Sequence, residues 1–362
     1  MSVLEQATRQ WSSRPADQRF SSLADIHAAT THHRSISAEA KDISVKSLKV
    51  ETKEIGGTTE PVLVGPSGNP APFTHYSFGQ FARRLSAPAD YIRTLPATLA
   101  ADNLNHGLAT LADDDKANLL FAKNGGLRLR ASLSGQYTRI WNSDITSRLI
   151  RLTEQAPEWQ PAPAAFDGSR GLYASDEDMF CFLVDNDRRI FEHDKNGGLG
   201  RGFFVSNSEV GAGSFAITTF FYEYICGNHR VWGAKGVAEL RIRHVGNADE
   251  RAFGQLAGEL RRYADASASA DEAKITAAQN FSLGGTKDEV LDKVFGLKSV
   301  GLSKRQIGAA YDLAEQRVDW YGNPRSVWGL TGGLTEIARD MPNAGERTKL
   351  DRAAGKLMEI AF

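Results

Sequence analysis

Two short segments of this chain repeat the same alternation of aliphatic and arginine residues. They are Leu127-Arg128-Leu129-Arg130 and Leu240-Arg241-Ile242-Arg243. Successive side chains of a β-strand point to opposite faces, so each segment predicts a strand with one aliphatic face and one face bearing two guanidiniums. The aliphatic face can pack on a core, and the arginines can fork onto phosphate oxygens. Two such strands in one sheet would form a basic surface suited to nucleic acid, although ordinary solvated strand faces also carry arginine.

The charge of the chain is balanced overall and sorted locally. Its formal net charge is −1 over 362 residues, so any nucleic-acid site must arise from local sorting. Asp144 is the only acid between residues 118 and 151, and Glu239 is the only acid between residues 230 and 244. Both stretches are rich in cations, whereas residues 152–194 between them are acidic. The two basic stretches therefore contain the candidate binding surface.

Aromatic residues lie among these basic stretches. Tyr137 and Trp141 belong to the first stretch, and Trp232 belongs to the second. Aromatic faces that stack on bases, together with cations that hold phosphates, are typical of proteins that bind single strands. Tyr137 and Trp141 also fit places in a core. The predicted nucleic-acid-binding residues are Arg128, Arg130, Tyr137, Arg139, Arg230, Trp232, Lys235, Arg241 and Arg243.

Turn residues predict two hairpins. Asn124-Gly125-Gly126 predicts the tip of a hairpin over residues 119–133. A second hairpin is predicted over residues 203–225, with its turn near residues 209–213. Glycine supplies the backbone freedom that such a turn needs. The residues predicted to shape this turn are Asn207, Ser208, Glu209, Gly211 and Gly213.

Capping boxes predict that helices dominate the last third of the chain. In a capping box, a side chain at the start of a helix and one three residues later each bond the other's backbone. Three such pairs are Asn247 with Glu250, Thr286 with Glu289, and Ser303 with Gln306. We therefore expect an α+β fold. Residues 1–246 should form a mainly antiparallel sheet with flanking helices, and residues 247–362 should form a mainly helical region that packs on it or follows it.

The chain shows few signs of metal or cofactor binding. Cys181 and Cys226 are too few for a disulfide framework. The Cys226-Gly227-Asn228-His229 segment offers only half of the paired spacing of a structural zinc site. The cysteines fit small buried thiols better. The glycine-rich residues 198–202 and 233–236 lack the spacing of phosphate-binding loops. We expect neither a metal nor a cofactor.

The sequence also gives little indication of catalysis. Acidic runs occur at residues 113–115, 176–178 and 185–187. Such runs are usual in solvated loops, but they could hold a divalent cation, which leaves a metal-dependent nuclease open. No recognisable motif places a serine or cysteine nucleophile. A non-enzymatic protein is favoured.

Two further features bear on location. Met1–Ser12 lacks the basic and then apolar pattern of a signal peptide. The most apolar window, residues 215–226, is short and interrupted by polar residues, so it predicts a buried strand and not a membrane span. We expect a cytoplasmic protein with no membrane partner.

Several motifs resemble a phage- and plasmid-associated family of unknown function, DUF932. The resemblance is carried by Phe204-Val205-Ser206-Asn207-Ser208-Glu209-Val210-Gly211-Ala212-Gly213, by Arg14-Pro15-Ala16-Asp17-Gln18-Arg19-Phe20, by Leu85-Ser86-Ala87-Pro88 with Tyr91 and Leu95-Pro96, by Arg130 with Leu133-Ser134 and Tyr137, by Cys226-Gly227-Asn228, and by Ser326-Val327-Trp328-Gly329-Leu330 with Leu334-Thr335-Glu336. These motifs follow the family's order over nearly the whole chain. One departure is His229, where the family often has glycine, which puts the geometry of that turn in doubt.

The resemblance implies a context and no activity. Relatives occur in prophages and conjugative plasmids, often near single-strand DNA functions. By fold-level analogy alone, a hairpin-rich sheet with a basic face also resembles single-strand annealing proteins of the RecT type. We therefore predict a single-stranded-DNA-binding protein that acts in strand annealing, recombination or protection of an incoming strand. It should form a homo-oligomer, because non-specific binding strengthens with the number of phosphates neutralised. The alternatives are a nuclease and a protein that inhibits a host defence system without touching DNA.

Overall fold

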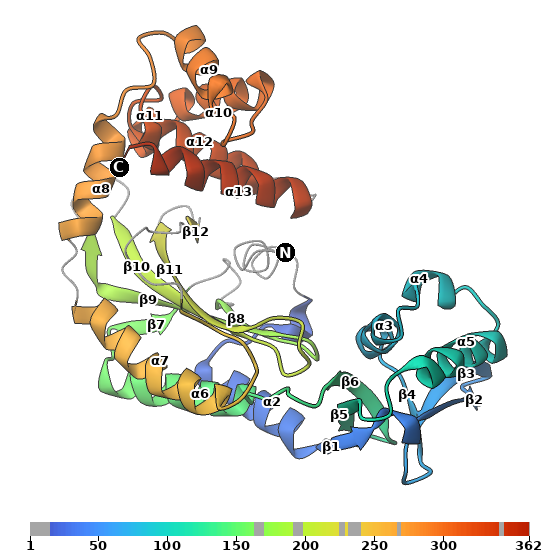
Figure 1. The fold of residues 1–362 in the computed structure, drawn as a ribbon. Coiled ribbons are helices and arrows are strands. Elements are labelled where there is room, and N and C mark those ends of the chain that lie inside the picture. The colour runs from blue at the N-terminus through green and yellow to red at the C-terminus, as the bar shows by residue number, and fades with distance from the viewer. Residues whose placement is uncertain are drawn as a thin grey trace.

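A computed structural model describes residues 15–162, 170–190, 198–223, 229–230, 240–265, 269–339 and 344–361. Helices and antiparallel strands are mixed along the chain, with helices alone after residue 247. This confirms the predicted α+β class. Figure 1 shows three regions along an arc: a small lobe with α3–α5, a central sheet, and the C-terminal helices.

The small lobe contains two three-stranded sheets, three α-helices and one short 3-10 helix. One sheet has the order β1-β5-β6 and the other has the order β2-β3-β4. Apolar residues of both sheets and of the helices form one core, which includes Val50, Phe81, Leu104 and Leu129. The elements are β1 (Ser37–Ser44), η2 (Val45–Ser47), β2 (Lys49–Ile55), β3 (Thr58–Val64), β4 (Pro70–Pro72), α3 (His75–Arg84), α4 (Ala89–Ile92), α5 (Ala97–Thr110), β5 (Lys116–Ala122) and β6 (Arg128–Ser134).

The central sheet has seven strands and two different faces. Its main path is β12-β11-β10-β9-β7, with β13 paired to β11 and β8 paired to β9. One face packs against α2, α6 and α7, which Figure 1 shows on the same side of the sheet. The alternate side chains form an aromatic cluster on the other face, including Phe182, Phe204 and Phe220. The strands are β7 (Trp159–Pro161), β8 (Leu172–Ala174), β9 (Met179–Ile190), β10 (Leu199–Asn207), β11 (Phe215–Glu223), β12 (His229–Arg230) and β13 (Leu240–Ile242).

Helices in this region come from distant parts of the sequence. A short 3-10 helix, η1 (Ala16–Gln18), precedes α2 (Leu23–Ser35), and α6 (Asn142–Gln155) follows the small lobe. Helix α7 (Ala248–Asp265) lies beyond residue 247 but buries Ala248, Ala252 and Leu256 in the same core as α2, α6 and the sheet. The helical last third of the chain therefore begins by packing on the central sheet.

The remaining helices form their own core. Ile190 and Leu199, at the adjoining ends of β9 and β10, contribute to this core, so the C-terminal helices pack on one end of the central sheet. Helices α10 and α12 cross closely at Gly333, where an added Cβ would lie only 2.0 Å from the carbonyl oxygen of Ala310. The helices are α8 (Ser269–Asn280), α9 (Lys287–Gly296), α10 (Lys304–Gln316), α11 (Val318–Tyr321), α12 (Val327–Arg339) and α13 (Ala344–Glu359).

The local signals in the sequence correspond to these elements. Both predicted hairpins form, as β5–β6 and β10–β11. Ser303 and Gln306 make the reciprocal capping box of α10. Thr286 caps α9, but the Glu289 carboxylate accepts from the Gly285 amide and not from Thr286. No helix within the described part of the chain combines the length and apolar character needed to cross a bilayer.

Candidate functional site

Strand β13 shows the alternation that its sequence predicts. Ile242 is buried in the core beneath α6 and α7, and Arg241 and Arg243 on either side of it are exposed. Ile242 lies opposite Phe215 and Arg241 lies opposite Ala216 of β11, which fixes the register. Neither guanidinium has an ion-pair partner among the described residues. Strand β13 and the residue that follows it therefore present two exposed cations to solvent.

Strand β6 departs from the predicted alternation. Arg128 is exposed, but Arg130 is buried. The pairing with β5 steps from Ala131 opposite Leu120 to Leu129 opposite Phe121, so Arg130 is the extra residue of a β-bulge. A bulge re-aims a side chain, which explains why Arg130 does not share the face of Arg128. The prediction of two guanidiniums on one face of this strand is therefore wrong.

The two arginine-bearing strands do not share a sheet. Strand β6 is an edge of the β1-β5-β6 sheet, whereas β13 belongs to the seven-stranded sheet. The two regions meet instead through an isolated bridge between Tyr137, just after β6, and Val245, just after β13. The exposed cations thus lie on two surfaces.

Arg130 enters a buried group of polar residues between the small lobe and the central sheet, named here the polar joint. Its Nη2 lies 3.5 Å from the Glu209 carboxylate and donates to the Asp176 carbonyl at 3.0 Å. Its Nη1 donates to the Ser37 hydroxyl at 3.0 Å. Burial, together with the nearby Arg130 charge, lowers the pKa of His33 beside this group. Arg130 is therefore committed to protein contacts.

Arg139 belongs to the same joint. Its Nε donates to the Glu39 carboxylate at 2.7 Å, and its Nη1 donates to the carbonyl of Glu209. The guanidinium also lies 5.6 Å from the ring centroid of Tyr137 and 5.4 Å from that of Trp141. Its side chain is 3% exposed, so the structure does not present Arg139 to solvent, as the predicted nucleic-acid contact would require.

The turn between β10 and β11 supplies the other half of the polar joint. Asn207 donates to the Ile140 carbonyl at 2.9 Å, and Ser208 donates to the Glu177 carbonyl at 2.5 Å. The Glu209 carboxylate accepts from the backbone amide of Asn142 at 2.9 Å. All three turn residues are almost fully buried. The turn thus holds the segments around it through specific polar contacts.

Glycine is required at one position of this turn. Gly211 has a φ of +80°, and an added Cβ would lie 2.7 Å from the Leu133 side chain. Gly213 has no such positive φ, so the predicted need for backbone freedom applies to Gly211. Next to Gly211, the Gln80 amide of α3 donates to the Val210 carbonyl at 2.6 Å and accepts from the Ser132 amide at 3.2 Å. Gln80 thereby connects α3 to the turn.

Tyr137 is not a free stacking platform. Its ring stacks on His244, with centroids 4.9 Å apart and planes 7° apart, and its hydroxyl donates to the Ser208 carbonyl at 2.8 Å. Burial raises the pKa of Tyr137 and lowers the pKa of His244 to about 4. The ring that was predicted to stack on a base is therefore engaged with an imidazole.

Other predicted residues lie outside the described residues. Trp232, Lys235 and Cys226 fall there, and only the backbone of Arg230, in β12, is described. The remaining cysteine, Cys181, is free and fully buried on β9, and burial raises the pKa of its thiol.

The acidic runs have local structural contacts. Asp113 lies 3.5 Å from Lys46, and Asp115 lies 2.5 Å from Arg84. Asp178 accepts from the Ser175 hydroxyl at 2.9 Å. Across the described ranges, no group of three or more His, Cys, Asp or Glu residues is placed to hold a metal ion.

Sequence reasoning missed the partners that make the polar joint. Gln80, Asp176 and Asn142 come from three separate segments, and no spacing in the sequence links them to Glu209. The available signal was the run Asn207-Ser208-Glu209, whose polar side chains stand between two apolar strands.

Searches against protein-family models, curated proteins and solved structures found no match to this chain.

Proposed function

We propose that the protein binds single-stranded DNA through β13 and the segment of residues 230–239 that leads into it. The observation that supports this most directly is the pair of exposed guanidiniums, Arg241 and Arg243, flanking the buried Ile242. A strand anchored by its aliphatic side holds both cations at a fixed spacing, which suits successive backbone phosphates. Arg230, Trp232 and Lys235 lie just upstream in the chain and add charge and one aromatic ring.

A third cation lies beside this strand. Arg251, in the first turns of α7, donates to the Val245 carbonyl at 2.6 Å and to the Arg243 carbonyl at 3.4 Å. Both bonds go to neutral carbonyls, no carboxylate of the described residues pairs with its charge, and the residue is exposed. Arg241, Arg243 and Arg251 therefore form one cationic edge, named here the β13 edge.

The corrected geometry reduces the number of contacts that one chain can make. Arg130 and Arg139 are buried in the polar joint, and Arg128 lies on another sheet. Since non-specific affinity grows with the number of phosphates neutralised, tight binding favours several chains on one strand. The proposal therefore includes a homo-oligomer. The role in annealing, recombination or strand protection rests on the resemblance to DUF932.

The test measures the binding of labelled oligonucleotides by fluorescence anisotropy at a series of salt concentrations. The double variant Arg241→Gln/Arg243→Gln should weaken binding equally for different sequences. It should also flatten the dependence of log affinity on log salt by roughly 0.7 per lost contact. The matched control is Lys49→Gln/Lys53→Gln, which removes two cations from β2 in the small lobe and should leave binding unchanged.

Two outcomes would overturn the proposal. One is wild-type binding by the Arg241→Gln/Arg243→Gln variant at every salt concentration. The other is cleavage of the oligonucleotide with added Mg²⁺ or Mn²⁺ that stops with EDTA, which would identify a nuclease. Because both arginines are exposed, the double variant should keep the wild-type Tm. Ile242→Asp should lower it sharply by placing a charge in the core.

A further inference from the structure

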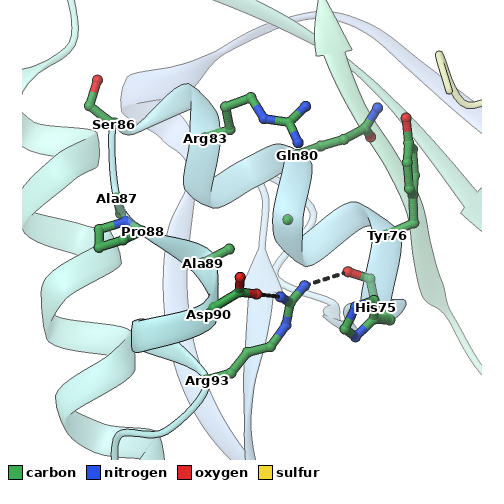
Figure 2. Close-up of a pocket in the computed structure, with 11 residues that line it drawn as sticks. His75, Tyr76, Gln80, Arg83, Ser86, Ala87, Pro88, Ala89, Asp90 and Arg93 are labelled. Atoms are coloured by element: carbon green, nitrogen blue, oxygen red, sulfur yellow. Dashed lines mark hydrogen bonds and ion pairs between the residues drawn. The ribbon is translucent and has the colours of Figure 1, made fainter. Parts of the chain in front are cut away.

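A pocket lies between α3 and α4, away from β13. Its volume is about 730 Å³. Gly79 lines it, and Figure 2 shows Tyr76, Gln80 and Arg83 along one side and Asp90, Arg93 and His75 along the other. The residues on α3 follow helical spacing, so one stripe of this helix forms the floor. A Cβ at Gly79 would lie 3.4 Å from Arg93 Nη2, at van der Waals contact, so a longer side chain here would extend over the floor towards Arg93.

The cations of this pocket differ in their contacts. Arg93 donates to the Asp90 carboxylate at 2.9 Å and to the His75 carbonyl at 2.9 Å, as the dashed lines of Figure 2 mark. Its charge is therefore balanced by Asp90. Arg83 is exposed and has no carboxylate partner among the described residues. The pocket thus carries one uncompensated guanidinium, which can fork onto an anionic group.

Ser86 adds a second, independent observation. It follows the C-terminus of α3 with a φ of +55°, a conformation that glycine usually supplies at this position. The backbone bonds from Ser86 to Arg83 and from Ala87 to Ala82 complete the helix ending, and glycine would make them equally well. The chain instead keeps a strained serine among the residues that line the pocket.

The walls indicate the rest of the ligand. The rings of His75 and Tyr76 stand at one end of the pocket, and the apolar Ala87-Pro88-Ala89 segment stands at the other. A cavity of this size holds more than a lone phosphate or carboxylate. Aromatic and apolar walls suit a planar base, and the free guanidinium suits a phosphate.

We propose that the pocket binds a nucleoside monophosphate. Arg83 holds the phosphate, and the nucleoside lies over Gly79. This site uses none of the residues of the β13 edge, so it stands apart from the proposed single-strand binding. The same chemistry is present in a free nucleotide and in the phosphorylated end of a strand.

The test is calorimetric titration of the full chain with 2′-deoxyadenosine 5′-monophosphate. Arg83→Gln should weaken its binding about tenfold or more, the usual effect of losing a hydrogen bond to a charged group. Gly79→Leu should abolish binding by filling the floor, and it replaces glycine by a better helix former, so α3 is kept. Lys53→Gln, an exposed cation on β2, is the control and should bind like wild type.

The comparison ligands are deoxyadenosine, which lacks the phosphate, and inorganic phosphate, which lacks the nucleoside. Both should bind more weakly than the nucleotide. The proposal is overturned if the nucleotide binds no better than either one. It is also overturned if the Arg83→Gln and Gly79→Leu variants both bind the nucleotide like wild type.

Oligonucleotides with a 5′-phosphate or a 5′-hydroxyl identify the source of the ligand. A preference for the phosphorylated strand that disappears in Arg83→Gln supports the proposal and identifies the strand end as a ligand. Nucleotide binding without such a preference supports it with a free nucleotide as the ligand. Loss of 5′-hydroxyl strand binding in Arg241→Gln/Arg243→Gln reports on the β13 edge, so the two proposals fail separately.

Discussion

Replacing Glu209 by alanine should destabilise the protein more than any surface change. Glu209 is 2% exposed, and its carboxylate lies 3.5 Å from Arg130 and accepts from the Asn142 amide at 2.9 Å. The variant leaves the Arg130 guanidinium, which is 6% exposed, without its carboxylate. Removing one partner of a buried ion pair costs about 3–5 kcal/mol, because the remaining charge stays desolvated.

That free energy converts into a measurable change of Tm. At roughly 2–4 °C per kcal/mol for a large cooperative unit, Glu209→Ala should lower Tm by about 10 °C in a calorimetric scan. Glu209→Gln keeps an acceptor for the Asn142 amide but removes the negative charge. It should therefore lower the free energy of unfolding by less, about 1–3 kcal/mol. Glu51→Ala removes an exposed acid that pairs with Lys49 on β2 and should change stability by less than about 1 kcal/mol.

Hydrogen exchange locates the effect. Amides of the β10–β11 turn and of β6 should exchange faster in Glu209→Ala, because the polar joint connects these two segments. The double variant Arg130→Met/Glu209→Leu removes both charges and should recover part of the lost stability. The reasoning fails if Glu209→Ala melts like wild type, or if the double variant is less stable than Glu209→Ala alone.

Three other predictions follow from single residues. Burial lowers the pKa of His244 to about 4, from 6.5 in an unfolded chain. Between these two pH values the unfolded state therefore binds more protons than the folded state. Stability should therefore fall between pH 6.5 and about 4, by roughly 1.4 kcal/mol per pH unit at most. Tm measured over this range should fall less steeply in His244→Phe, and parallel curves would contradict the assignment. Ser86→Gly should raise stability by about 1 kcal/mol, because it relieves a left-handed residue, and an unchanged or lower denaturant midpoint would argue against strain. In a Cys226→Ser background, Cys181 should resist iodoacetamide until the protein unfolds, because burial raises the pKa of its thiol, and rapid alkylation of the native protein would contradict this.

The parts of the fold that sequence predicts are those set by local chemistry. Asn124-Gly125-Gly126 has the residues of a tight turn, and the structure has β5 and β6 on either side of it. Ser303 and Gln306 have capping spacing, and they cap α10. These structures depend on a few neighbouring residues, so their conformational preferences can be predicted from the sequence. The α+β class follows from the sum of such local signals.

The polar joint depends on hydrogen bonds and an ion pair between residues far apart in the sequence, which local sequence patterns do not predict. Arg130 and Glu209 are 79 residues apart, and the Gln80 amide reaches a carbonyl 130 residues away. The α3–α4 pocket likewise requires knowing how two short helices pack. Sequence reasoning could identify Asn207, Ser208 and Glu209 as turn residues, but the segments that bury them became visible only in the fold.

The two arginine-bearing segments show why one pattern has two outcomes. Arg241, within the regular strand β13, and Arg243, just after it, remain exposed, whereas the bulge at Arg130 turns its guanidinium into the joint. A buried arginine requires a buried acid, and Glu209 supplies it. It follows that a variant lacking Arg128, Arg130, Arg241 and Arg243 together would mix loss of stability with loss of charge. A change of the exposed Arg241 and Arg243 therefore tests the proposed DNA binding apart from folding, and a change at Arg130 reports on the joint.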